Sequence, residues 1–166
     1  IITMAKATTN GIVPMGVVAV REKIYQSVMD ASPEGAVELF HGYTYSGIPV
    51  AVSAAIAVQK IFEKEDIFNR VKKLSSYFED GLHSLKDLSC IDSIRNYGLL
   101  GGIDISMRDK PGKAGFNVYK KCYDAGVNIK PTGDALIIAP PFICEKKDID
   151  ELIEKMRKGI TNHLKS

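Results

Sequence analysis

The order of apolar patterns after residue 65 is the feature that most constrains what this chain can fold into. Between Asp66 and Leu85, apolar residues recur at three- and four-residue spacings, a pattern that predicts an amphipathic helix. Helical patterns return at Phe116–Asp124 and Asp148–Leu164, and four β-type segments lie between the helices, at 91–96, 100–106, 127–130 and 135–139. This alternation predicts a small α/β domain in which helices cover a largely antiparallel sheet.

The first part of the chain has a different pattern. Ile1–Met4 and Val13–Val20 are predicted as strands, the first of them buried. Pro49–Glu63 is so rich in Ala, Val and Ile that we expect a helix with most of its circumference covered by protein. Because apolar residues begin at Ile1 with no capping signal, we interpret the start of the chain as a cut end.

Composition excludes several classes of function. With 45% hydrophobic and 25% charged residues, the 166-residue chain has the composition of a soluble globular protein. The net charge is +2 and the lysine pairs stand among acidic neighbours, so nucleic-acid binding is not expected. Three widely spaced cysteines suggest neither disulfides nor a metal site, and no apolar run is long enough for a membrane span. We therefore expect a cytoplasmic protein.

Three segments of the sequence contain residues that suggest chemistry. The first is Ile2-Thr3-Met4-Ala5-Lys6 with Thr9-Asn10-Gly11 and Pro14-Met15-Gly16. The second is the segment from Phe40 to Pro49, FHGYTYSGIP. The third is Gly133-Asp134-Ala135-Leu136 with Ala139-Pro140-Pro141. In their order and spacing, these three segments resemble those of the class III (omega) aminotransferases, which depend on pyridoxal 5'-phosphate. The likeness covers essentially the whole chain.

The resemblance implies a fold, a cofactor and a reaction. It implies the C-terminal part of a fold-type I transferase, with residues 1–64 from the large cofactor-binding domain and residues 65–166 forming the small α/β domain with an antiparallel sheet. It also implies a homodimer that transfers an amino group from an omega-amino acid or amine to a keto acid such as pyruvate. No nucleic-acid or membrane partner is implied.

Lys6 is the residue that the resemblance identifies as the catalytic, cofactor-binding lysine. A lysine nucleophile must be neutral, so its pKa has to fall from the usual value of about 10.4 through desolvation or nearby positive charge. A position between two apolar strands would supply that desolvation. The alternative is a lysine at a strand end whose amine simply reaches water; the Thr9-Asn10-Gly11 context favours the catalytic interpretation.

Tyr43 and Thr44 lie in the second segment, and the resemblance implies that both contact the cofactor. Thr44 offers a hydroxyl in a glycine-flanked loop, a suitable lining for a phosphate. In the family, this threonine reaches the phosphate of the neighbouring subunit, which implies an obligate dimer. A loop threonine bonded to its own backbone is the alternative. We interpret His41 as a structural or interface residue, because no metal-ligand spacing surrounds it.

Lys130 stands where the family usually has an arginine for the substrate carboxylate. Lysine keeps the positive charge and loses the planar, two-pronged grip on a carboxylate. Ile48 is a second departure, at a position where histidine is common in the family. The glycine-rich run from Gly98 to Gly102 lies between two predicted strands, so it is interpreted as a tight turn and not as a phosphate loop.

The family's phosphate-binding cup, the aromatic residue on the cofactor ring and the aspartate at the ring nitrogen all precede the lysine. None of them falls within these 166 residues. We therefore expect the isolated chain to bind the cofactor weakly and to transaminate slowly or not at all. Two interpretations stay open: a fragment or separately encoded half of an aminotransferase, or a non-catalytic remnant that persists as a folded, interacting or self-associating domain.

Overall fold

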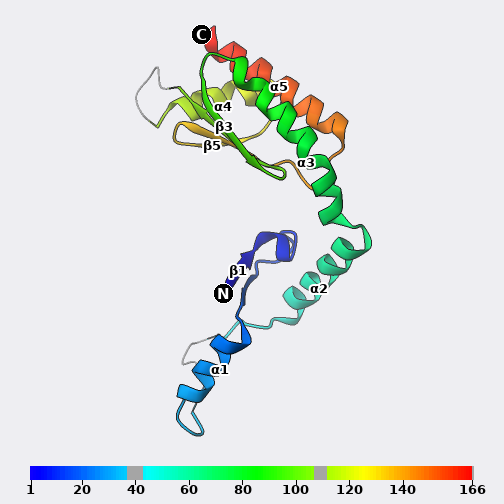
Figure 1. Cartoon of the computed structure of the whole chain (residues 1–166), viewed down its shortest axis with the longest axis vertical. Coiled ribbons are helices and arrows are strands. Elements are labelled where there is room, and N and C mark those ends of the chain that lie inside the picture. The colour runs from blue at the N-terminus through cyan, green and yellow to red at the C-terminus, as the bar shows by residue number, and fades with distance from the viewer. Residues whose placement is uncertain (37–42, 107–111, 166) are drawn as a thin grey trace. The chain divides into compact units, whose positions relative to one another are not determined.

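The chain divides into two compact units, Ile1–Glu65 and Asp66–Ser166 (Figure 1). The computed structural model describes residues 1–36, 43–106 and 112–165. The predicted roles of Phe40 and His41 therefore concern residues outside the described ranges. No helix within those ranges combines the length and the apolar character needed to cross a membrane.

The first unit contains two short strands and two helices. Strands β1 (Ile2–Ala5) and β2 (Gly16–Ala19) pair antiparallel, and the 3-10 helix η1 (Lys6–Thr8) follows β1 directly. Helices α1 (Glu22–Ala31) and α2 (Pro49–Lys64) complete the unit. Only Thr9, Ala51 and Val58 are buried among the described residues of this unit. The prediction of a buried first strand is thus wrong for this chain, since all four residues of β1 are exposed.

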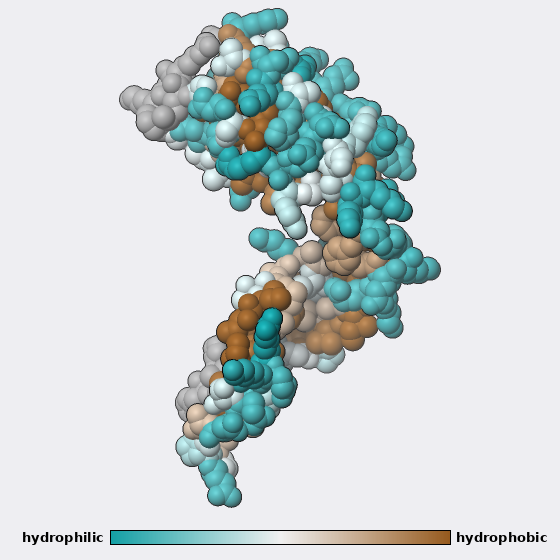
Figure 2. Space-filling view, viewed as in Figure 1, coloured by the Kyte–Doolittle hydropathy of each residue, from teal (hydrophilic) through white to brown (hydrophobic). Residues whose placement is uncertain are grey.

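Helix α2 forms where its apolar composition predicts it, but it is far less covered than expected. Pro49 stands in its first turn, where a missing N–H removes no helical hydrogen bond. Val50 is 66% exposed and Ile56 51% exposed, so part of the apolar circumference has no cover in the described chain. Figure 2 shows brown, apolar side chains gathered on the surface of the first unit. Two strands and two helices with three buried residues do not make a core.

The second unit is an α/β domain, as predicted. Its elements are α3 (Ile67–His83), η2 (Ser84–Asp87), β3 (Ile91–Tyr97), β4 (Leu100–Ile105), α4 (Ala114–Asp124), β5 (Lys130–Thr132), β6 (Ala135–Ile138) and α5 (Lys146–Leu164). The strands form one sheet in the order β3-β4-β6-β5, with every neighbouring pair antiparallel. Gly98, in the left-handed region at φ 57°, makes the tight turn between β3 and β4 that its sequence context predicts.

A closed core lies between the sheet and the three helices of this unit. Helices α3 and α5 pack against each other, and α5 also packs against α4 (Figure 1). Side chains with no exposed surface come from every layer: Phe78 and Leu82 of α3, Val118 and Cys122 of α4, Met156 and Ile160 of α5, and Ile103 and Leu136 of the sheet. The apolar face that the sequence spacing predicts for each helix therefore packs toward the sheet.

Two glycines let this core close. A Cβ on Gly159 would lie 2.6 Å from Cys122 Cα, so only glycine permits α5 to approach α4 this closely. A Cβ on Gly115 would lie 2.6 Å from the Gly133 carbonyl oxygen, so the start of α4 rests directly on the turn between β5 and β6.

Candidate active site

Lys6 lies at the exit of β1, in an unusual backbone conformation. The preceding residue, Ala5, pairs with Gly16 of β2. Lys6 then adopts a φ of 57°, in the left-handed region that non-glycine residues rarely occupy. The side chain is exposed, and no residue within the described ranges forms a hydrogen bond or ion pair with its amine. The expected desolvation between the two strands is therefore wrong for this chain.

Thr9 holds the turn that follows Lys6. The Lys6 carbonyl oxygen accepts hydrogen bonds from the backbone N–H groups of Thr9 and Gly11, each at 3.3 Å. The Thr9 hydroxyl donates to the Val13 carbonyl oxygen at 2.6 Å, and Thr9 is 1% exposed. Asn10 and Gly11 are also left-handed, with φ of 51° and 77°. Asparagine and glycine tolerate that region best, which explains the Thr-Asn-Gly sequence here.

A pocket of about 630 Å³ brings the first two sequence motifs together. Its lining includes Pro14, Met15 and Gly16 from the first motif, and Tyr43, Thr44, Tyr45, Ser46, Gly47 and Ile48 from the second. Both predicted cofactor contacts, Tyr43 and Thr44, are in this set. Lys6 is not, although Gly16 in the lining is the strand partner of its neighbour Ala5. The structure thus gathers the motif residues within one unit.

Ser46 and Gly47 are lining residues that the sequence analysis did not select. Gly47 is left-handed at φ 71°, and no atom lies within 4 Å of the place where a Cβ would stand. The signal for both was present in the sequence, because a Ser-Gly pair next to a threonine is typical of loops that present hydroxyl and N–H donors.

Lys130 lies on the edge strand of the second unit, in a row of residues that crosses the whole sheet. Arg95 of β3 pairs with Gly102 of β4, Gly102 pairs with Ile137 of β6, and Ile137 pairs with Lys130 of β5. Residues directly opposite in a sheet point to the same face. Since the flanking Ile103 and Leu136 are buried against the helices, this row occupies the opposite face of the sheet, and Lys130 is exposed there.

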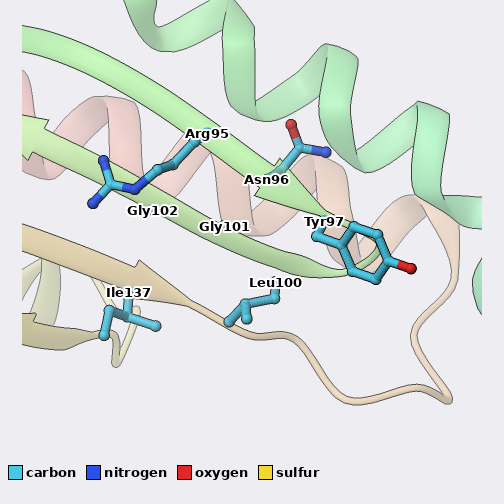
Figure 3. Close-up of a pocket in the computed structure, with 7 residues that line it drawn as sticks. All are labelled: Arg95, Asn96, Tyr97, Leu100, Gly101, Gly102 and Ile137. Atoms are coloured by element: carbon cyan, nitrogen blue, oxygen red, sulfur yellow. The ribbon is translucent and has the colours of Figure 1, made fainter.

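Arg95 is the residue of this row that the sequence analysis missed. Its side chain lies across Gly102, where an added Cβ would be 3.4 Å from the Arg95 Nε (Figure 3). Asp104 fixes the guanidinium through an ion pair on one nitrogen and a 3.1 Å hydrogen bond on the other. Arg95, Tyr97, Leu100 and Ile137 line a shallow, mostly apolar pocket of about 380 Å³ on this face (Figure 3).

The electrostatics of this pair lower one pKa. The hydrogen bond from Arg95, with a second from the Ser93 hydroxyl at 2.6 Å, holds the pKa of Asp104 below its ordinary value. The same hydrogen bond raises the pKa of Arg95. Arg95 is thus already paired within its own sheet, whereas Lys130 has no ion-pair partner among the described residues.

The third motif has a structural task in this unit. The Asp134 carboxylate accepts hydrogen bonds from the backbone N–H groups of Gly112 and Ala114, at 2.8 to 3.0 Å, just before and at the start of α4. Gly133 is left-handed at φ 58° in the turn between β5 and β6. Asp134 therefore connects the β5–β6 hairpin, which contains Lys130, to the N-terminus of α4. There the carboxylate binds N–H donors that have no partner within the helix.

Comparison with known proteins agrees with this arrangement. Residues 1–160 match the family described as aminotransferase class-III, and the chain belongs to that family. The resemblance inferred from the three motifs is confirmed.

Two curated relatives are similar over most of this chain. An omega-aminotransferase of Caulobacter vibrioides is 40% identical over 159 residues, which cover 95% of this chain and 36% of the relative. An omega-amino acid–pyruvate aminotransferase of Pseudomonas putida is 39% identical over 157 residues, covering 91% and 34%. The chain thus spans about a third of the length of the curated relatives that it matches.

A solved structure shares the fold. An amine transaminase from an uncultivated Pseudomonas species, in a PLP-bound form, superposes with a TM-score of 0.85 at 24% identity. The match covers 96% of this chain and 38% of the other. This confirms the predicted α/β fold.

Proposed function

We propose that this chain provides the lysine-bearing and C-terminal part of a class III aminotransferase. The enzyme would use pyridoxal phosphate to move an amino group from an omega-amino acid or amine to a keto acid such as pyruvate. The supporting observation is the match over residues 1–160 to relatives that include an omega-amino acid–pyruvate aminotransferase. The pocket that gathers Tyr43 and Thr44 against Gly16, the strand partner of the residue just before Lys6, supports the same proposal.

The residues of the first unit fit a phosphate-bearing aldehyde. Thr44 and Ser46 bring hydroxyl groups to the pocket, and Gly47 leaves open space beside them. Hydroxyl and backbone donors of this kind suit a phosphate. When bound, pyridoxal phosphate supplies the electron sink for the exchange of an amino group.

The side chains of the chain itself would bind, orient and move protons. The Lys6 amine would attach to the cofactor aldehyde and later carry a proton between substrate and cofactor carbons. Thr44, with Tyr43 beside it, would hold the phosphate end of the cofactor bound by the neighbouring subunit. Lys130 would attract the substrate carboxylate through a single positive charge, with a looser geometry than an arginine would impose.

Domain roles and assembly are part of the proposal. Residues 1–64 would belong to the large cofactor-binding domain and residues 65–166 would form the small C-terminal domain. Thr44 would serve the phosphate of a second subunit in a homodimer, located in the cytoplasm. The exposed apolar residues of the first unit support a covered state, because such surface is typical of regions that contact further protein.

A second function is favoured by one observation. The second unit has a closed core of its own, with side chains such as Phe78 and Met156 fully buried. A domain of this kind can persist as a folded interaction module without the transferase chemistry.

Chemical attachment of the cofactor separates the two proposals. The 166-residue chain is incubated with pyridoxal phosphate, reduced with borohydride, and mapped by mass spectrometry. We expect labelling at Lys6 to be about tenfold faster than at Lys23, an exposed lysine of the same unit, because a placed amine reacts faster than a free one. Transamination itself is expected to be slow or absent.

Matched variants complete the test. Lys6→Ala should remove the fast label, while Lys23→Ala should leave it unchanged. Equal labelling of Lys6, Lys23 and Lys130 would contradict the catalytic proposal and favour the interaction module.

A further inference from the structure

We propose that Thr9 is a positioning residue that aims the Lys6 amine. This inference rests on the proposed function, because it assigns Thr9 a task toward the reacting lysine. The juxtaposition that carries it is a buried threonine hydroxyl bonded across the turn that keeps Lys6 in the left-handed region.

The direction of the Lys6 side chain depends on one backbone angle. Ala5 is extended, at φ −155° and ψ −172°, and its pairing with Gly16 fixes the end of β1. Rotation about the N–Cα bond of Lys6 then sets where its Cβ points relative to that strand. If φ relaxed from 57° to the usual helical value of about −60°, the Cβ would swing by about 120° and carry the amine to another side of the strand.

A left-handed lysine needs external support. The Cβ of a non-glycine residue crowds the backbone in this region, so the conformation persists only when surrounding contacts enforce it. The two N–H groups that bind the Lys6 carbonyl oxygen come from Thr9 and Gly11. These bonds are 3.3 Å long and therefore weak, so another contact has to fix the residues that make them.

Thr9 supplies that contact. Its hydroxyl, in a residue that is 1% exposed, donates a 2.6 Å, partly buried bond to the Val13 carbonyl oxygen, and its own carbonyl oxygen accepts from the Ile12 N–H at 3.2 Å. Helix α2 also contacts the η1 turn. Thr9 thus links Lys6 to the segment that leads into β2, and it is the only buried polar residue in the described ranges.

Thr8 offers a matched control one residue away. Its hydroxyl oxygen is also buried, yet it has no hydrogen-bond partner among the described residues. Removing an unpaired hydroxyl leaves the turn bonds intact, whereas removing the Thr9 hydroxyl leaves the Val13 carbonyl oxygen unpaired.

The test compares Thr9→Val, Thr9→Ser and Thr8→Val in the full chain with two measurements. The first is the three-bond HN–Hα coupling of Lys6 by NMR, which reports its φ without any cofactor. The second is the rate at which pyridoxal phosphate attaches to Lys6, with Lys23 as the reference lysine in the same molecule. In that reaction the Lys6 Nζ bonds to the aldehyde carbon and the aldehyde oxygen leaves as water.

We expect Thr9→Val to relax the Lys6 φ and to slow attachment at Lys6 by about tenfold, the factor set by loss of a buried hydrogen bond. Attachment at Lys23 should not change. Thr9→Ser, which keeps the hydroxyl, should stay within about twofold of the wild type, as should Thr8→Val. A rate loss in Thr9→Val together with a changed pH profile at Lys6 supports positioning, because a general loss of stability would affect both lysines.

Unchanged attachment and an unchanged Lys6 coupling in Thr9→Val would overturn the proposal. If Thr9→Val loses the β1–β2 pairing of Thr3 with Val18, the variant Thr9→Cys is added. The rates of attachment at Lys6 must then fall with the hydrogen-bond donor strength of residue 9, in the order Thr, Ser, Cys. Any other order also overturns it. If Lys6 of the wild-type chain is labelled no faster than Lys23, the proposed function is refuted instead. The HN–Hα coupling of Lys6 would still show whether Thr9 supports the turn.

Discussion

The two units of this chain contain similar apolar sequences but use them differently. The second unit buries its apolar residues between four strands and three helices, whereas the described part of the first unit buries only Thr9, Ala51 and Val58. Both have amphipathic or apolar helices. The contrast shows that a hydrophobic pattern predicts which residues tend to be buried. A core forms only where a second layer of secondary structure lies within the same unit.

Hydrogen exchange should show the largest difference between the units. We expect backbone amides of β4 to exchange about a thousandfold more slowly than those of β1 and β2, because opening β4 requires loss of the core. Mass spectrometry of peptides from the two sheets measures this ratio. Equal protection would mean that the first unit is stabilised by something other than its own buried residues.

Phe78→Ala tests the core of the second unit. Phe78 has no exposed surface, so truncation should lower the free energy of unfolding by about 3–5 kcal/mol. Val18→Ala is the matched change in the first unit, where the side chain is 63% exposed and we expect almost no effect. Urea unfolding followed by circular dichroism gives both values, and a similar loss in the two variants would break the contrast.

Glycine replacements test the same contrast at positions that differ in how closely neighbouring atoms approach the backbone. Gly159→Ala forces a Cβ to within 2.8 Å of the Cys122 backbone nitrogen, and we expect a loss of about 1–3 kcal/mol from the resulting overpacking. Gly16→Ala in the first unit meets no atom within 4 Å and should be tolerated. Thermal unfolding of both variants checks this prediction; a neutral Gly159→Ala would show that α4 and α5 can separate freely.

Asp134→Ala should have a smaller effect within the second unit. It removes the carboxylate that binds the N–H groups of Gly112 and Ala114, and caps of this kind contribute about 1–2 kcal/mol. Asp134→Asn keeps an acceptor and should recover most of that loss. A chemical-shift change confined to the start of α4 and the β5–β6 turn would identify the cap as the cause.

The pair of Asp104 and Arg95 should give the smallest effect, since both side chains are well exposed. Because the folded-state pKa of Asp104 is lowered, its stabilisation is present above the unfolded pKa of about 3.9 and is lost as the pH falls through the folded value. Asp104→Asn should therefore be slightly less stable than the wild type near neutral pH and equal to it in acid. Urea midpoints at several pH values measure the difference, and a gap that persists in acid would assign the effect to packing.

Most elements of the second unit could be predicted from the sequence, because each amphipathic face has its partner nearby in the chain. The exception is the strand predicted at 127–130, which is wrong at both ends: β5 spans Lys130–Thr132 and shares only Lys130 with the prediction. The residues around Gly126 form the C-terminal ending of helix α4, where the Val127 N–H donates a hydrogen bond to the Cys122 carbonyl oxygen. A helix ending of that type competes with strand formation over the next residues.

The candidate site was harder to predict in three dimensions than in sequence. The motifs identify Lys6, Tyr43 and Thr44 as residue types, and the pocket does gather the last two. The expected desolvation of Lys6 failed because apolar strands exclude water only when something packs on them. Arg95 was missed because its position depends on strand register, which a single sequence does not reveal.

Gly102 has a consequence for the order in which substitutions can accumulate. Arg95 fills the space where a side chain at position 102 would begin, at 3.4 Å from its Nε. An alanine at 102 would only reach ordinary van der Waals contact with Arg95, whereas a larger residue would redirect the Arg95 side chain and disturb its ion pair with Asp104. The effect of a large residue at 102 should therefore depend on which residue stands at 95, and the effects of changing both positions should not simply add.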